Sequence, residues 1–316
     1  MLLETIPSSM SSTLRSKRFS YHPVGYAILL KRMKFFQYMM ENFECESACE
    51  GKRNSVDSEK LTPLHLAALL GNCEAVELLM SLEKVDKTPK TSIQATPLHS
   101  AAMGGSLEVV KLLLKYKSTR IDARNALNET PFHYAALHGK ANIVEFMMKN
   151  VKNKSPKCRK GYDPLHRAAK KGRLDCVKVM LSEGIDCYSR KPSSGNTALH
   201  LATRNNHFEV ISALLEHNPA LSDEHNNMGH TAFHEAVRKG KVECVKHLLR
   251  HGINQNVKTN NNILDTSLHI AVRNSRLKVI RVLLEDPLIE DQPDKYGMTA
   301  LHVAAQKGKV DYVEKF

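Results

Sequence analysis

The stretch T-P-L-H-L-A-A-L-L-G, from Thr62 to Gly71, decides the fold because it returns along the whole chain with small changes. Its histidine recurs at intervals of 33 to 35 residues. An alanine always stands two residues after that histidine, and a Val or Ile stands eleven residues after it. A fixed period of this length indicates a repeat architecture in which each copy is one small supersecondary unit. The eight histidines are His65, His99, His133, His166, His200, His234, His269 and His302.

Each copy predicts a short helix, a tight turn, a second helix and a polar loop. A threonine, or Asp163 in one copy, stands three residues before the histidine, where its oxygen can cap a helix start. In four copies a proline follows, at the first helical position, where a missing N–H costs nothing. Six residues after the histidine, glycine favours the left-handed conformation that ends a helix. Asn206 is a usual substitute for this glycine, whereas Ser275 departs from the pattern and is expected to distort its turn.

These residues resemble the ankyrin repeat, whose pattern is T-P-L-H-x-A-A with a period of about 33 residues. The resemblance covers Leu61 to Phe316, with eight copies in phase. It implies an all-α fold, an α-solenoid of stacked helix-turn-helix repeats with projecting hairpin loops and a concave groove. Elementary physics agrees, because a single helix pair cannot bury its apolar face and its neighbours must stack on it.

The sequence predicts three parts along the chain. Residues 1–21, with six serines and a basic cluster, are interpreted as a flexible arm. Residues 22–60 are interpreted as a degenerate capping repeat and a long loop, because Ala27 aligns with Ala67 when Pro23 is placed under Pro63. Residues 61–316 form the eight repeats, and the last of them is cut short at Phe316. We therefore expect the natural protein to continue beyond this residue.

Composition narrows the class of protein. The formal net charge of +13 and the isoelectric point near 9.4 favour acidic partners or surfaces. Seven cysteines without a C-x-x-C pair favour a reducing, intracellular and cytoplasmic setting. No apolar run approaches the roughly 20 residues that span a bilayer, so no membrane span is expected.

No enzyme, metal or cofactor motif stands out in the chain. Phosphate-binding glycine loops, nucleophile elbows and H-E-x-x-H sequences do not occur. Each repeat histidine lacks a second ligand three or four residues away, so we expect it to hydrogen-bond between neighbouring loops and helices. The sequence predicts no catalytic residues, no metal ligands and no cofactor. Five further histidines could cluster across repeats as metal ligands but are interpreted as solvated polar residues: His217, His225, His230, His247 and His251.

The variable positions carry the functional prediction. In the resembling family, the two residues before the turn glycine line the groove, and here they change from apolar in the first three copies to mostly basic in the last five. The segment from Lys149 to Lys178 has a net charge of +9. The candidate partner-binding residues are Leu69, Leu70, Met103, Leu137, His138, Lys154, Lys157, Arg159, Lys160, Lys170, Lys171, Arg204, Arg238, Lys239 and Arg273.

The sequence thus favours a non-catalytic scaffold that mediates protein–protein interaction through its groove and loop tips, with an acidic protein as the expected partner. An anionic membrane surface is a second candidate partner. Nucleic acid is disfavoured because only Tyr162 lies among the positive charges as a stacking platform. The alternative is a truncated cytosolic N-terminal array of a TRPA-type cation channel, which the irregular loops and scattered cysteines resemble. That alternative would place the chain at the cytosolic face of a membrane.

Overall fold

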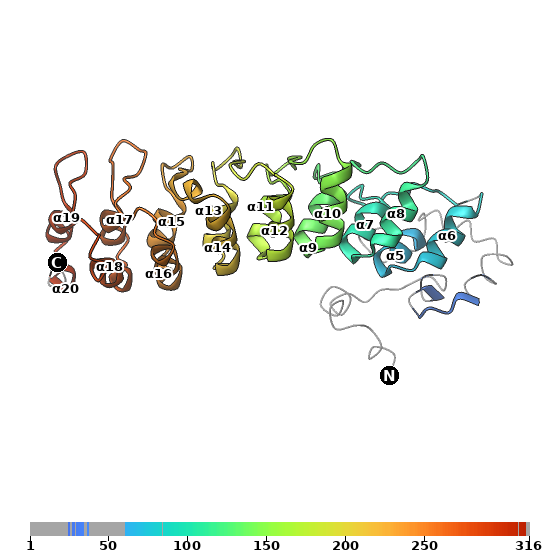
Figure 1. The fold of residues 1–316 in the computed structure, drawn as a ribbon, viewed down its shortest axis with the longest axis horizontal. Coiled ribbons are helices and arrows are strands. Elements are labelled where there is room, and N and C mark those ends of the chain that lie inside the picture. Colours follow the sequence, from blue (N-terminus) through green and yellow to red (C-terminus); the bar gives the residue numbers. More distant parts are fainter. Residues whose placement is uncertain are drawn as a thin grey trace. The chain divides into compact units, whose positions relative to one another are not determined.

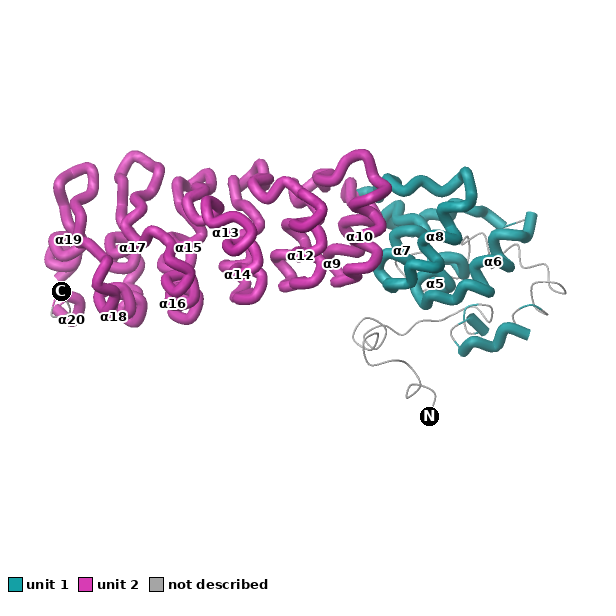
Figure 2. Tube along the Cα trace, viewed as in Figure 1, with its two compact units in different colours: residues 1–126 teal, residues 127–316 magenta. Residues whose placement is uncertain are grey.

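The computed structural model describes residues 61–83, 85–308 and 310–313, and positions 25, 27, 28, 30–34 and 37 near the start of the chain. The predicted arm of residues 1–21, most of the predicted capping repeat and Phe316 lie outside the described residues. The chain divides into two compact units, residues 1–126 and residues 127–316 (Figure 2). Every regular element among the described residues is helical, which confirms the all-α fold class.

Unit 1 contains two complete helix pairs. Helices α5 (Pro63–Leu70) and α6 (Cys73–Ser81) form the first pair, and α7 (Pro97–Gly104) and α8 (Leu107–Leu114) form the second. The first helices, α5 and α7, pack against each other, and so do the second helices, α6 and α8. The apolar residues two and eleven positions after each histidine are fully buried between them. Stacking therefore buries a face that a single pair would leave exposed.

Unit 2 repeats the same arrangement, with each first helix packed on the next and the second helices packed in the same way from α10 to α18 (Figure 1). The loops between its pairs project on one side of the row. Its helices are α9 (Pro131–His138), α10 (Ala141–Asn150), α11 (Pro164–Lys171), α12 (Leu174–Ser182), α13 (Ala198–Arg204), α14 (Phe208–His217), the 3₁₀ helix η2 (Pro219–Asp223), α15 (Ala232–Lys239), α16 (Val242–Arg250), α17 (Ser267–Arg273), α18 (Leu277–Leu284), α19 (Ala300–Gln306) and α20 (Val310–Val313).

The helix starts and turns follow the sequence motif. Thr62 is the N-cap of α5, Pro63 its first residue, and Gly71 ends it with a left-handed φ of 72°. The prediction that Ser275 distorts its turn is wrong, because Ser275 adopts a left-handed φ of 56°, close to the 60° of Asn206. The Ser275 N–H donates to the Val272 carbonyl at 3.1 Å, so the turn closes with its usual backbone bond.

The loops are hairpin-like, although no strand is assigned in the described part of the chain. In one loop of unit 2, the N–H of Cys158 donates to the carbonyl of Tyr162 at 2.9 Å. Neighbouring loop tips are joined as well, since the N–H of Arg159 donates to the carbonyl of Leu127 at 2.8 Å and that of Asn227 to Ser194 at 3.0 Å. These bonds fix the projecting loops as a row.

Candidate partner-binding surface

The apolar groove candidates are partly buried in both units. Leu69, Leu70 and Met103 lie at the ends of first helices in unit 1, and Leu137 and His138 lie at the end of α9 in unit 2. Burial, together with the positive charges of Arg173, Lys140 and Lys171, lowers the pKa of His138 to about 4. His138 is therefore neutral at pH 7 and extends the uncharged surface of Leu137.

Two of the predicted groove cations make ion pairs inside unit 2. Arg238 donates to both carboxylate oxygens of Glu235, which also accepts from His230. Arg273 lies 3.1 Å from a carboxylate oxygen of Asp265 and 3.1 Å from one of Asp294. The charges of these two arginines therefore already neutralise buried carboxylates, and their role in partner binding stays a prediction.

Lys157 is similarly engaged. Its Nζ donates to Ser189 Oγ at 2.6 Å and to the carbonyl of Arg190 at 2.8 Å, and it lies 3.6 Å from Asp163. Lys157 thus fastens its own loop to the next one. Lys154 makes a single exposed bond, to the carbonyl of Glu183 at 3.2 Å.

The ion pairs of Arg273 involve two residues of a cluster whose side chains could bind a metal ion. Ligand atoms of Asp265, His269 and Asp294, three buried residues, lie within 4.8 Å of one another. The guanidinium of Arg273 already bridges the two carboxylates. Both ring nitrogens of His269 are also used, by Thr266 and by the carbonyl of Met298 at 2.8 Å. This cluster is a structural ion-pair network and not a metal centre.

The remaining basic candidates point to solvent. Arg159, Lys160, Lys171, Arg204 and Lys239 are exposed, and Lys170 is half-buried. No ion pair involves any of these six residues within the part of the chain that the structure describes. We call these six residues the basic row; they come from one loop tip and from the ends of α11, α13 and α15.

A pocket of about 400 Å³ lies at the loop end of the basic row, between the loop tips of two neighbouring repeats. Lys157, Arg159, Lys160 and Lys191 line it, together with Tyr162 and other residues of the same loops. The ring of Tyr162 has three cationic groups around it at 5.0–5.2 Å from its centroid, from Arg167, Lys170 and Lys191. Of these three, Arg167 pairs with a carboxylate, that of Glu129.

Asp163 joins these loops to the start of helix α11. It is fully buried, its Oδ1 accepts from the N–H of His166 at 2.9 Å, and its Oδ2 accepts from Ser189 Oγ at 2.5 Å. Burial alone would raise its pKa, but the hydrogen bonds from His166 and Ser189 outweigh burial and lower the pKa to about 2. The predicted cap at Asp163 is thus confirmed, and it also ties the following loop to this helix start.

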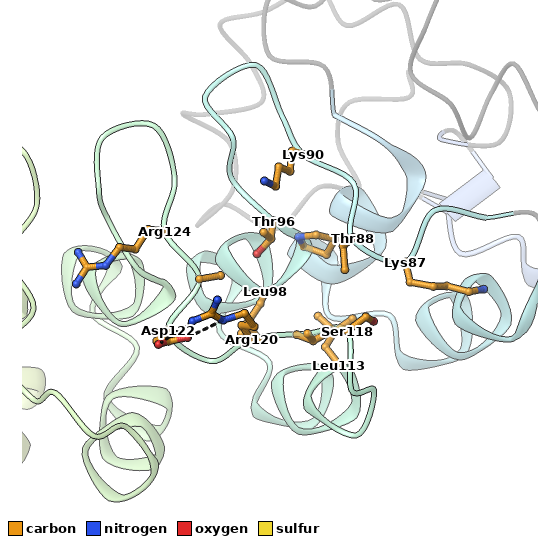
Figure 3. Close-up of a pocket in the computed structure, with 13 residues that line it drawn as sticks. Lys87, Thr88, Lys90, Thr96, Leu98, Leu113, Ser118, Arg120, Asp122 and Arg124 are labelled. Carbon is orange, nitrogen blue, oxygen red and sulfur yellow. Dashed lines mark hydrogen bonds and ion pairs between the residues drawn. The ribbon is translucent and has the colours of Figure 1, made fainter.

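Unit 1 contains a second pocket, of about 410 Å³, that the sequence had not indicated (Figure 3). Lys87, Lys90, Arg120 and Arg124 from two successive loops line it, and an exposed pair at 3.3 Å joins Arg120 to Asp122. The sequence did not indicate this pocket because its cations come from two loops about one repeat apart and so form no local charge cluster. Acidic Asp122 inside the pocket makes it a poorer anion site than the pocket in unit 2.

Sequence reasoning also missed the apolar residues of the loop tips. Met228 is 58% exposed and Tyr296 is 72% exposed, and Leu127 and Ile93 are exposed too. All four stand six residues before their repeat histidine. Alignment of that position across the copies reveals them.

Comparison with known proteins agrees with this geometry. A family model described as ankyrin repeats (three copies) matches residues 24–125, 98–191, 186–259 and 256–316. The chain belongs to the ankyrin-repeat family. Among solved structures, this ankyrin-repeat chain is similar to the ankyrin repeat domain of Bcl-3, a member of the IkappaB protein family. The two share 25% identity with a TM-score of 0.61, and the match covers 70% of this chain and 97% of that one.

No curated protein sequence matches the ankyrin-repeat chain. The looser resemblance to the array of a TRPA-type channel is not confirmed by these comparisons. Among the described residues, no helix has the length and apolar character that crossing a membrane requires. Ankyrin repeats are in general protein–protein interaction modules, and no enzyme family is indicated.

Proposed function

We propose that this ankyrin array is a non-catalytic scaffold whose unit 2 binds an acidic segment of a protein partner along the basic row. The observation that carries the proposal is the pocket beside Tyr162, where Lys160, Arg159 and Lys191 converge. In a folded protein, cations gathered this closely repel one another unless a carboxylate offsets them. An acidic ligand would relieve that repulsion.

The basic row supplies several charges rather than one strong contact. Exposed charges farther apart than about 10 Å are largely screened at 0.1 M salt, so a single lysine contributes little. Positive charges on three successive repeats act together, and such patches raise association rates and select acidic partners. The exposed tip residues Met228 and Tyr296 offer apolar contacts in the same unit.

A protein partner fits these features better than nucleic acid does. The ring of Tyr162 already has the unit's own Arg167, Lys170 and Lys191 close to it, so a base would compete with these cations for stacking on the ring. The five described cysteines are free thiols, which supports the intracellular setting.

The alternative, a TRPA-type channel array, rests on sequence resemblance alone. Reading the gene beyond Phe316 for apolar stretches of about 20 residues would decide it.

The test compares two triple charge reversals in the full chain. The first, Arg159→Glu with Lys160→Glu and Lys171→Glu, changes the basic row. The second, Lys178→Glu with Lys278→Glu and Arg281→Glu, changes three exposed cations of α12 and α18 by the same total charge. The probe is a fluorescently labelled peptide rich in Glu and Asp, and its binding is followed by anisotropy.

We expect the first triple variant to weaken peptide binding by about tenfold or more and the second to change it far less. Equal losses in both variants would mean that only net charge matters, and the proposal would be overturned. It would be overturned as well if vesicles containing phosphatidylserine bound in a manner sensitive to the first variant while the peptide did not bind. That result would identify a membrane surface as the ligand.

A further inference from the structure

Two histidines on one outer helix converge on a single atom of the neighbouring helix. Helices α14 and α16 pack against each other in unit 2 (Figure 1). His247 lies on α16 and His251 caps its C-terminal end, four residues later, so both side chains share one face. The Nε2 atom of each ring lies 2.9 Å from Oγ of Ser212 on α14. The two ring centroids are 4.9 Å apart.

A serine hydroxyl cannot donate a hydrogen bond to both rings at once. It has one proton, so it can donate to one Nε2 atom, and the other ring must then donate its own Nε2–H. The arrangement therefore aims the metal-binding edge of two imidazoles at one point. All three side chains are half-buried, so the point is also open to solvent species. The interpretation of His247 and His251 as merely solvated residues is thus corrected.

The surroundings of His247 hold its ring against the facing helix. The centroid of the His247 ring lies 5.3 Å from that of the Phe208 ring. This contact with the first residue of α14 orients the imidazole.

Two carboxylates stand on the facing helix. Glu209 and Glu216 stand three residues before and four residues after Ser212, so they share its face of α14. Both are exposed and can change rotamer without breaking a core. Two imidazoles and one carboxylate are a ligand set that zinc accepts with tetrahedral geometry.

We propose that His247 and His251, joined by a carboxylate of α14, bind a divalent transition metal ion of the zinc class on the outer helices of unit 2. The ion would take the position that both rings now face, with Ser212 displaced to its edge. Imidazole nitrogens bind such an ion at about 2.0–2.1 Å, so a small rotation of each ring closes the site. Imidazole favours zinc, nickel and copper over magnesium or calcium. This site is independent of the basic row and of its acidic partner.

The test titrates the full chain with Zn²⁺ by calorimetry and with Co²⁺ by visible absorption. The chain has 16 histidines, so matched variants are needed to separate this site from background binding. His247→Gln and His251→Gln each remove one ligand. His217→Gln is the control, because His217 is exposed at the end of the same α14 and makes no contact with Ser212 in the described structure. Circular dichroism confirms that each variant is folded.

We expect one tight Zn²⁺ site per chain, with affinity falling about tenfold or more in either ligand variant because chelation is lost. The control should bind as the parent does, and Ser212→Ala should retain the site. A tetrahedral Co²⁺ spectrum that disappears in His251→Gln would support the proposal. Unchanged Zn²⁺ affinity in folded His247→Gln and His251→Gln would overturn it, whatever the acidic peptide does.

Discussion

Each repeat histidine links its own helix start to the following loop. At His200, the backbone N–H of Thr197 donates to Nδ1 at 3.3 Å, so the ring proton lies on Nε2. That Nε2–H donates to the carbonyl of His230 at 3.0 Å. The same pattern joins His65 to Ala95. The sequence-based expectation of a structural histidine is confirmed by these bonds, and it followed from the eight equal positions in eight separate repeats.

These histidines make stability depend on pH. Burial lowers the pKa of His65 and His200 to about 4 and that of His234 to about 3. In the unfolded chain these histidines take up protons near pH 6.5, whereas in the folded chain they stay neutral at that pH. Their contribution to the free energy of unfolding is therefore fully present above pH 6.5 and declines as the pH falls towards 4. For one such histidine the loss amounts to about 3 kcal/mol.

We expect urea midpoints to fall between pH 7.5 and pH 5 in the parent chain. The His200→Gln variant starts from a lower midpoint, because the amide cannot make both ring bonds, and should lose less over this range. His302→Gln, at an exposed repeat histidine, serves as the control. A parent midpoint that is equal at both pH values would contradict the burial of these rings in their neutral form.

At the scale of the loop, one position always adopts a left-handed backbone. Five residues before each repeat histidine, from the second described repeat onward, φ lies between 60° and 76°. Glycine occupies four of these seven positions, and the others are Gln94, Asn128 and Leu264. A bulky residue such as Leu264 pays a steric cost there that glycine does not.

Leu264→Gly is therefore expected to stabilise unit 2. The gain should be about 1 kcal/mol, measured as a higher urea midpoint, because relief of the left-handed strain exceeds the added chain entropy. The reverse exchange at the equivalent position, Gly297→Ala, has open space around it and should cost about as much. A lower midpoint for Leu264→Gly would show that its exposed side chain makes stabilising contacts.

At the scale of the helix, Gly104 sets how closely α5 and α7 approach. A Cβ atom added at Gly104 would lie 2.1 Å from the carbonyl oxygen of Leu69, which is backbone and cannot rotate away. Gly104→Ala must therefore separate the two helices, at a cost of about 1–3 kcal/mol. His138→Ala, at the equivalent position of the next repeat, is the control. Equal denaturant midpoints for Gly104→Ala and the parent would disprove the close approach.

The helices were predictable because their signals are local. The threonine cap, the proline and the turn glycine all act within ten residues of one another. The site was predictable only in part. Arg273 looked like a groove cation, but stacking brings it against Asp265 eight residues earlier and Asp294 in the next repeat. Alignment of repeats compares equivalent positions, so it cannot reveal pairs between different positions of neighbouring repeats.

At the scale of the molecule, identical stacking contacts leave the surface free to vary. The buried alanines and valines recur in both units and give the family its fold. The surface cations do not recur in this way, and several of them form ion pairs with carboxylates of the same chain. The proposed partner surface of unit 2 consists of the basic row, the pocket beside Tyr162 and the apolar loop tips.

The most direct measurement is the salt dependence of acidic-peptide binding by the parent chain. The dissociation constant of the labelled Glu- and Asp-rich peptide is determined from about 0.05 to 0.3 M NaCl, a range over which screening shortens from roughly 14 to 6 Å. We predict that binding weakens steeply with salt, and that the slope becomes shallow in the triple reversal of Arg159, Lys160 and Lys171. A dissociation constant that is indifferent to salt, or a slope that the triple reversal leaves unchanged, would contradict an acidic partner bound along the basic row.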